Sequence, residues 1–144
     1  MRTRRRLLGL SQRDLSKLTG VKQPLLSAIE SGKRQATPAV SGALEHHLQV
    51  RPSVALDVLR PQVKETIVRH HGKSGAVFGS VAAGTDTTAS DLDLIVEFAP
   101  DCDIVELLAL QDDLAGLLTV PVDVVSAGSS SAFVQAAKQQ AVPL

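Results

Sequence analysis

Residues 79–96 read GSVAAGTDTTASDLDLIV, and this stretch is the strongest indication of the fold. A Gly-Ser pair is followed, after ten residues, by Asp91-Leu92-Asp93 and then by an apolar run that ends at Val96. Because side chains alternate along a β-strand, we expect Asp91 and Asp93 on one face and Leu92 on the other. Two carboxylates on one face of an otherwise buried strand are costly unless a cation lies between them. Mg²⁺, which takes one or two carboxylates together with substrate phosphates, meets that requirement.

A third aspartate, Asp123, lies in a second run that is typical of a buried strand. Residues 119–125 read TVPVDVV, so a single acid is surrounded by β-branched residues. If this strand lies beside the strand of Asp91, three carboxylates can hold two metal ions about 4 Å apart for in-line phosphoryl displacement. The alternative is a solvated edge strand with unrelated aspartates. The third acid and the Gly-Ser pair at a fixed distance argue against that alternative.

The Gly-Ser pair supplies the other half of the expected site. Residues 75–78 (GAVF) predict a strand, and Gly79-Ser80 marks the point at which this strand turns into a short helix. A helix N-terminus offers free backbone N–H groups and the positive end of its dipole to a phosphate. Glycine allows close approach, and the Ser80 hydroxyl adds one donor. The pattern therefore indicates a phosphate-bearing substrate next to the metal.

The combined motif resembles the nucleotidyltransferase superfamily of the DNA polymerase beta type, and the short length points to its minimal nucleotidyltransferase branch. The likeness covers about residues 62–144, including the tail KQQAVPL at 138–144. It implies an α/β nucleotidyltransferase fold, two Mg²⁺ ions, and transfer of a nucleoside monophosphate from a nucleoside triphosphate, ATP in our hypothesis, with pyrophosphate as leaving group.

The resemblance also implies roles for five residues. Gly79 and Ser80 would hold the triphosphate, and Asp91 and Asp93 would ligate both metals. Asp123 would ligate the catalytic metal and help to activate the acceptor hydroxyl. In one respect the chain departs from the family pattern: many members carry Arg just before the second glycine of the motif, where this chain has Ala83-Gly84. The loss of that cation leaves a catalytically inactive domain as an open alternative.

The first sixty residues follow a different pattern. Residues 11–19 (SQRDLSKLT) open with Ser11, a favourable N-cap, and carry apolar residues at helical spacing. Gly20 suits a sharp turn, and residues 22–31 (KQPLLSAIES) resume a helix with proline in its first turn. Two short helices joined by a glycine-containing turn predict a helix-turn-helix. The alternative is an ordinary helical hairpin.

This segment closely resembles the Xre family of phage-repressor-like DNA-binding domains, which implies a lambda-repressor-like all-α bundle. On that likeness three pairs of residues approach DNA: Gln12 and Lys22 at the phosphate backbone, Gln23 and Ser27 at base edges, Lys33 and Arg34 as clamps on phosphates. Glutamine can pair bidentately with adenine in the major groove. The basic stretch 2–6 (RTRRR) forms an arm that either contacts phosphates or is solvated, and both interpretations stay open.

Charge divides the chain independently of either resemblance. Residues 1–60 carry 11 Lys and Arg against 4 Asp and Glu, a net of +7. Residues 61–144 carry 4 against 11, a net of −7. A basic module that binds nucleic acid and an acidic module that collects metals would produce this asymmetry.

The fold class we expect is a two-domain α+β chain, with a helix-turn-helix bundle at 1–55 and a nucleotidyltransferase domain at 56–144. The first domain is completed by a helix at 38–48. The second is predicted as a small mixed sheet with helices on one side. Its last two helices are expected at 104–118 and 131–140. Cys102 is the only cysteine, which excludes intrachain disulfides and fits a reducing cytoplasm. No segment has the length of a membrane span.

The sequence also predicts the surroundings of two further groups of polar residues. The adjacent pairs His46-His47 and His70-His71 diverge by about 100° on a helix and cannot share one metal, which favours surface or interface roles. Asp86, in the loop before Asp91, either takes part in metal binding or is solvated, and solvation is the favoured expectation.

Together these features favour a DNA-binding regulator fused to a minimal nucleotidyltransferase, resembling the antitoxin half of a bacterial toxin–antitoxin pair. The resemblance implies operator DNA and a cognate toxin as partners, such as a HEPN-type ribonuclease or another kinase or nuclease toxin, and we expect a homodimer. The main hypothesis is Mg²⁺-dependent transfer of AMP from ATP to a toxin hydroxyl, with tyrosine favoured. The first alternative is a transcriptional repressor whose inactive transferase domain serves dimerisation or toxin binding. The second is a transferase that is itself the toxin and modifies the acceptor end of tRNA.

Overall fold

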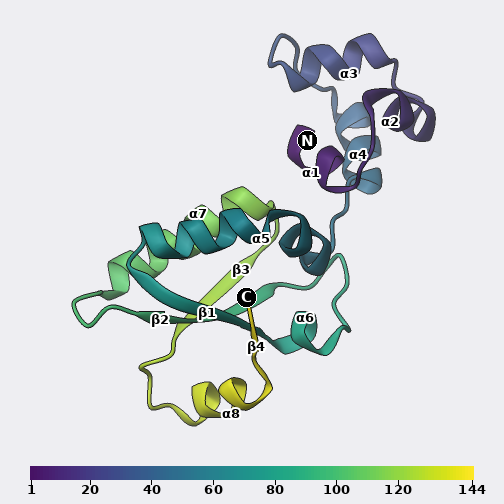
Figure 1. The fold of residues 1–144 in the computed structure, drawn as a ribbon. Helices are drawn as coiled ribbons and strands as arrows, with labels where there is room; N and C mark the ends of the chain where they lie inside the picture. The colour runs from purple at the N-terminus through teal and green to yellow at the C-terminus, as the bar shows by residue number, and fades with distance from the viewer. The chain divides into compact units, whose positions relative to one another are not determined.

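The computed structural model describes all residues, 1–144, and the chain divides into two compact units. Unit 1 spans Met1–Val50 and unit 2 spans Arg51–Leu144 (Figure 1). The division lies just before helix α5, which begins at Pro52, a residue favoured in a first helical turn. The domain boundary that we expect after residue 55 therefore falls inside α5.

Unit 1 contains four helices: α1 (Arg2–Leu7), α2 (Gln12–Thr19), α3 (Gln23–Glu30) and α4 (Pro38–His47). The local sequence accounts for the turn between α2 and α3. The Ser11 hydroxyl accepts a hydrogen bond from the Asp14 amide, while the Asp14 carboxylate accepts one from the Ser11 amide, which forms a capping box. At its other end α2 stops at Gly20, whose φ of 72° is in the left-handed region. The predicted helix-turn-helix is confirmed.

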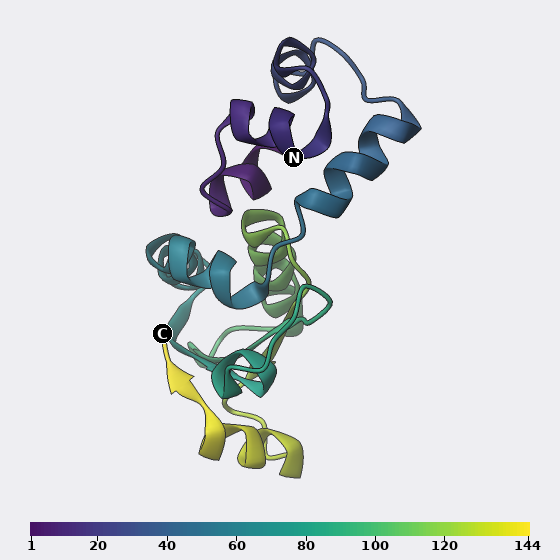
Figure 2. The same cartoon turned by 90° about the vertical axis from the view of Figure 1, so that its right-hand side faces the viewer.

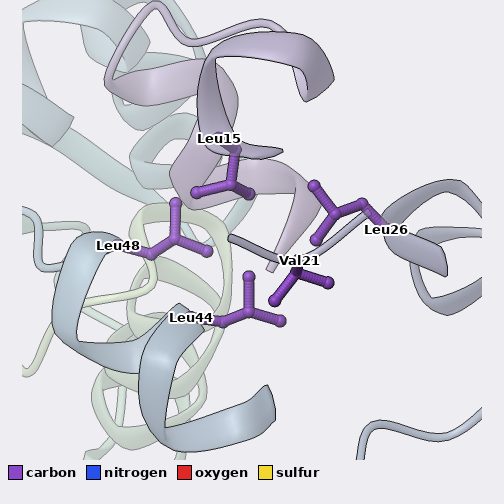
Figure 3. Packing of buried hydrophobic residues seen from close by; sticks show 5 residues of the cluster. All are labelled: Leu15, Val21, Leu26, Leu44 and Leu48. Atoms are coloured by element: carbon purple, nitrogen blue, oxygen red, sulfur yellow. The ribbon is translucent and has the colours of Figure 1, made fainter. Parts of the chain in front are cut away.

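The core of unit 1 is a small cluster of aliphatic side chains contributed by α2, α3, α4 and the turn between α2 and α3. Figure 3 shows its five buried members, Leu15, Val21, Leu26, Leu44 and Leu48. Leu15 and Leu26 are completely buried. Because α4 and its C-cap residue Leu48 supply two of the five, the helix expected at 38–48 does complete the bundle.

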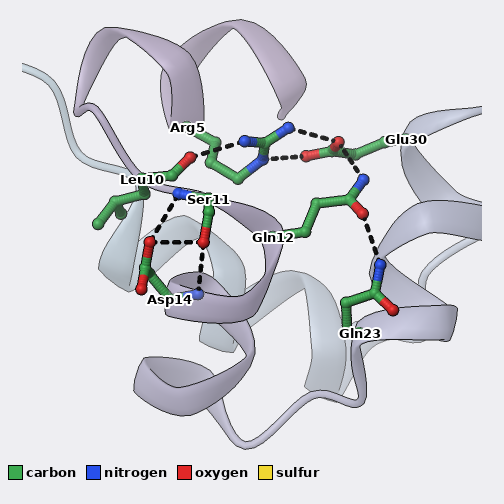
Figure 4. A network of polar contacts seen from close by, with 7 residues as sticks. All are labelled: Arg5, Leu10, Ser11, Gln12, Asp14, Gln23 and Glu30. Atoms are coloured by element: carbon green, nitrogen blue, oxygen red, sulfur yellow. Dashed lines mark hydrogen bonds and ion pairs between the residues drawn. The ribbon is translucent and has the colours of Figure 1, made fainter.

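The basic N-terminal stretch is a helix, and one of its arginines belongs to the interior of unit 1. Arg5 is buried and forms a two-point ion pair with Glu30, with Nε 2.7 Å from Oε1 and Nη2 2.9 Å from Oε2 (Figure 4). Its Nη1 also donates to the Leu10 carbonyl at 2.6 Å. Neither interpretation of a basic arm is right for Arg5, since its charge holds α1 to the end of α3.

Unit 2 contains four helices and four strands: α5 (Pro52–Arg69), β1 (Gly72–Phe78), α6 (Gly79–Ala83), β2 (Leu92–Phe98), α7 (Ile104–Leu118), β3 (Val122–Ser126), α8 (Ala132–Gln140) and β4 (Val142–Pro143). The sheet order is β3-β2-β1-β4, with β2 and β3 parallel and the other pairs antiparallel. The predicted small mixed sheet is confirmed, and β4 adds a strand that we did not expect. None of the helices is both long and apolar enough to cross a membrane.

Helices cover both faces of this sheet, so the expectation of helices on one side is wrong. Helices α5 and α7 lie on one face and α8 on the other (Figures 1 and 2). The reason is the alternation along β2: Leu94 and Val96 are completely buried on one face, while Ile95 packs with Phe78 and with Ala137 of α8 on the other.

A candidate nucleotide and metal site and a candidate DNA interface

The three aspartates predicted from the sequence lie on neighbouring segments of the sheet. Asp93 is in β2, Asp91 directly precedes that strand, and Asp123 is in β3. The parallel register of β2 and β3 pairs Asp93 with Asp123. Leu92 and Leu94, which point to the opposite face, are completely buried. Alternation along β2 therefore leaves its acids on the face that α5 and α7 do not cover.

The electrostatics of these acids favour a cation. The pKa of Asp93 is raised, first by burial and then by the negative charges of Asp123 and Asp91. The charges of Asp123 and Asp91 are thus close enough to oppose the ionisation of Asp93. The ion pairs of unit 2 join other residues, and no Lys, Arg or His forms an ion pair with any of the three. A bound divalent cation would relieve this repulsion.

Gly79 lies directly against the Asp93 carboxylate. It follows Phe78, which pairs with Asp93 across β1 and β2, and its φ of 67° is in the left-handed region. A Cβ placed on Gly79 would collide with Asp93 Oδ2. Glycine is therefore required twice, by its backbone conformation and by the space next to the carboxylate. Ser80 is the next residue of α6 and is half-buried. The Gly-Ser turn therefore lies next to the acids.

The protein side chains alone do not enclose a metal ion. No three His, Cys, Asp or Glu side chains converge tightly enough to hold one. The donor set nevertheless suits Mg²⁺, which binds through one or two carboxylates and completes its octahedral shell with waters and substrate phosphates. Three carboxylates without a cationic partner, one of them against the Gly79 backbone, suit a metal that arrives with a triphosphate.

Asp86 fixes the loop that leads to Asp91, a role that the sequence reasoning missed. It is buried, and it accepts hydrogen bonds from Arg51 Nη2 at 2.7 Å and from the Ser53 amide at 2.9 Å. Burial raises the pKa of Asp86, but the hydrogen bonds from Arg51 and Ser53 outweigh it and the net pKa is lowered. The expectation that Asp86 is solvated is wrong, because it caps the N-terminus of α5.

The histidine pairs behave differently from each other. Both ring nitrogens of His70 contact carboxylates of α7, with Nδ1 2.8 Å from Glu106 and Nε2 2.8 Å from Asp113. His70 therefore ties the C-terminal end of α5 to α7. His47 Nδ1 lies 2.9 Å from the Ala43 carbonyl within α4.

Four of the six residues expected to touch DNA are exposed on unit 1. Lys22 precedes the first residue of α3, and Ser27 lies on that helix. Lys33 and Arg34 follow α3 in the turn after Gly32, whose φ is 74°. These positions gather donors and positive charge around the second helix of the helix-turn-helix.

Gln12 and Gln23 are instead engaged within the unit (Figure 4). Gln12 Nε2 donates to Glu30 Oε2 at 2.8 Å, and Gln23 Nε2 donates to Gln12 Oε1 at 2.8 Å. The hydrogen bond from Arg5 lowers the pKa of Glu30, so this carboxylate acts as an acceptor and orients both amides. The bidentate adenine pairing expected for Gln23 would require its bond to Gln12 to break.

Comparison with known proteins agrees with the folds of unit 1 and unit 2. Unit 2 has the fold of a nucleotidyltransferase, and residues 62–142 match the family model described as "Polymerase beta, Nucleotidyltransferase". Residues 1–54 match the family model described as "Helix-turn-helix". The chain therefore belongs to the polymerase beta family of nucleotidyltransferases and carries an Xre-type helix-turn-helix domain before it.

Two curated relatives from Methanocaldococcus jannaschii align with this chain over 73 residues, or 51% of it. "Putative protein adenylyltransferase MJ1215" is 36% identical with 85% of its length covered, and "Putative protein adenylyltransferase MJ0128" is 38% identical with 74% covered.

Two solved structures share the fold of unit 2. "Structure of putative minimal nucleotidyltransferase" has 35% sequence identity and a TM-score of 0.53, covering 62% of this chain and 95% of the other. "Crystal structure of the toxin-antitoxin with AMP-PNP" has 24% identity and a TM-score of 0.53, covering 58% and 69%. At that identity the second likeness concerns the fold alone.

Proposed function

We propose that this protein is an antitoxin that transfers AMP from ATP to a hydroxyl group of its toxin, with Mg²⁺, and that its helix-turn-helix unit represses its own operon. The observation that carries the catalytic part is the register of Asp93 with Asp123, with Gly79 against Asp93 and no cationic side chain paired with either acid.

Each residue of the site would have a distinct task. Asp91 and Asp93 would hold Mg²⁺, which when bound neutralises phosphate charge and orients the reacting oxygens. The Gly79 backbone, which lies against the Asp93 carboxylate, would approach the triphosphate closely, and the Ser80 hydroxyl would donate to it. Asp123 accepts the proton of the acceptor hydroxyl, whose oxygen bonds to the α-phosphorus. The bond from that phosphorus to the bridging oxygen of the β-phosphate breaks, and pyrophosphate leaves.

Two comparisons support the choice of nucleotide and of acceptor class. The relatives described above both carry the name "Putative protein adenylyltransferase", which favours AMP as the transferred group and a protein as acceptor. The solved toxin–antitoxin structure contains AMP-PNP, an ATP analogue. The genetic neighbour of this chain is therefore the first acceptor to test.

The helix-turn-helix unit would recognise operator DNA through α3. Lys22, Lys33 and Arg34 would contact phosphates, and Ser27 would reach a base edge. Gln23 would contribute a base contact only after releasing Gln12. The net charge of +7 on residues 1–60 favours this role. We expect a dimer on paired half-sites.

A repressor with an inactive transferase domain is the second candidate function. It is favoured by Ala83, an exposed residue at the end of α6 where many family members have arginine. In that case the acids would still be present, but no AMP would be transferred, and the domain would serve toxin binding or dimerisation.

Label transfer separates the two candidates. The neighbour-encoded protein should become labelled by ATP carrying ³²P at the α-phosphate and not at the γ-phosphate, in the presence of Mg²⁺. The double variant Asp91→Ala with Asp93→Ala should abolish labelling, whereas Glu65→Gln, which changes an exposed acid of α5, should not. Labelling that persists in the double variant would overturn the site assignment, and absence of labelling by the wild type would favour the inactive domain.

A further inference from the structure

Helix α7 is apolar on two opposite sides. Its inner side buries Leu110, Leu114 and Leu118 completely. On its outer side the first two turns present Ile104, Val105 and Leu108, with exposed fractions of 64%, 68% and 49%. A surface helix of a globular protein normally places polar residues opposite its buried stripe, and a helix that is apolar all round is normally buried. The outer face of α7 therefore has the composition of a covered surface.

A groove continues this apolar surface at the start of α7. Its volume is about 580 Å³, and Ile104 belongs both to the exposed face and to the groove wall. Phe98, Pro100 and Leu107 supply further apolar lining. Such a hollow beside a flat apolar face can accept an anchoring side chain from a partner protein.

The charges around this surface are almost all negative. Residues 101–113 contain five acids and no Lys or Arg. Of these acids, Glu106 and Asp113 are engaged by His70, which leaves three exposed acids beside the apolar residues: Asp101, Asp103 and Asp112. Glu97 and Asp103 also line the groove, with Lys73 as the single cation there.

These charges decide which kind of partner fits. A second copy of this chain on the same face would bring two sets of acids together with no base between them, and like charges at an interface are costly. A partner that presents apolar residues flanked by Lys or Arg would complement both the apolar centre and the acidic rim.

The position of the surface leaves the catalytic acids free. Asp93 is the second residue of β2, whereas α7 begins after the far end of that strand. The five residue steps from Asp93 to Phe98, at about 3.3 Å each, separate the two regions by roughly 17 Å. A partner can therefore be held at α7 while one of its hydroxyl groups reaches Asp123.

We propose that the outer face of α7, formed by Ile104, Val105 and Leu108 with the adjoining groove, is the docking surface for the acceptor protein. The partner would contribute an apolar helix face flanked by basic residues. The identity of the partner as the neighbour-encoded protein rests on the proposed function.

The test is calorimetric titration of the neighbour-encoded protein into the full chain without ATP. Leu108→Lys should raise the Kd about 30-fold or more, as expected for a residue at the centre of an interface. Val68→Lys is the matched control, because it adds the same charge to α5 at a valine that is 66% exposed, and it should leave the Kd unchanged. Raised salt should also weaken the wild-type complex. Circular dichroism checks that both variants fold.

Three results would overturn the docking proposal: equal affinity of Leu108→Lys and wild type, an equal loss in Val68→Lys, or no complex with the wild type. A fourth result would be a homodimer that Leu108→Lys dissociates while the neighbour-encoded protein still binds. The outer face of α7 would then be the contact between two copies of this chain. The proposed catalysis is judged separately by label transfer. Labelling with an unchanged KM for the acceptor in Leu108→Lys would leave catalysis standing without this surface. A complex that Leu108→Lys breaks, without labelling of the wild type, would leave the surface standing without catalysis.

Discussion

Replacing Glu30 with glutamine tests the polar network that organises unit 1. Glu30 accepts two hydrogen bonds from Arg5 and one from Gln12, and the exposed fractions of the Glu30 and Arg5 side chains are 3% and 11%. Removing one partner of a buried ion pair costs about 3–5 kcal/mol, and glutamine, which keeps one acceptor, should be near the lower limit, about 3 kcal/mol. A unit of fifty residues has a free energy of unfolding of roughly 2.5–7.5 kcal/mol. The substitution should therefore remove about 40% or more of the free energy of unfolding of unit 1.

The assay must report the two units separately. The chain has no Trp or Tyr, so urea titration is best followed by ¹H–¹⁵N NMR, which gives a midpoint for each unit. Glu30→Gln should lower the midpoint of unit 1, while Glu45→Gln, at an exposed acid of α4, should change the free energy of unfolding by no more than about 0.5 kcal/mol. A midpoint for Glu30→Gln within the range of that control would refute the structural role of the ion pair.

The pH dependence of the same network has a defined sign. The Arg5 hydrogen bond lowers the pKa of Glu30 below its ordinary value of 4.5, so the unfolded chain binds more protons in the interval between the two pKa values. The stabilisation from Glu30 is therefore complete above about pH 5 and is lost as the pH falls through the lowered pKa. In Glu30→Gln this loss on acidification should disappear, which the same NMR titration at pH 3 and pH 7 would measure.

Three further substitutions test unit 2. Asp86→Asn removes the partner of Arg51 and should lower the free energy of unfolding by about 2 kcal/mol in urea, and a loss no larger than that of the exposed Asp57→Asn would contradict this. Gly79→Ala should slow AMP transfer about 100-fold, because the added methyl collides with the Asp93 carboxylate, and an unchanged rate would contradict this. Asp93→Asn should raise the melting temperature of the metal-free protein at pH 7. The pKa of Asp93 is raised above its ordinary value of 3.8, so the folded protein loses stability as the pH rises from that value through the raised pKa. A lower melting temperature in Asp93→Asn would contradict the repulsion of Asp93 by Asp123 and Asp91.

Much of this fold could be predicted from the sequence because its signals are local. Ser11 and Gly20 define the ends of α2 through capping, which depends on residues within one turn. The helix predicted at 104–118 has those bounds in the structure. The apolar run around each acid predicts two buried strands, and the structure supplies what the sequence left as a condition, the adjacency that pairs Asp93 with Asp123.

The features that escaped prediction depend on contacts between residues distant in the sequence. Arg5 and Glu30 are 25 residues apart, and Arg51 and Asp86 are 35 apart, so nothing in the neighbouring sequence marks these charges as buried. Strand β4 has only two residues, too few for a periodic pattern, and is defined by its pairing with β1. Helix α8 covers the second face of the sheet because Ile95 and Phe78 pack against it. The sequence pattern indicates only that these two residues belong to strands.

The central claim is that the three aspartates hold Mg²⁺ together with a nucleoside triphosphate. Calorimetric titration of AMP-PNP with Mg²⁺ into the wild type and Asp123→Asn tests it most directly. We predict binding by the wild type that requires Mg²⁺ and that weakens at least about 10-fold, or 1.4 kcal/mol, in the variant. Equal affinity in the two proteins, or binding that is indifferent to Mg²⁺, would contradict the account.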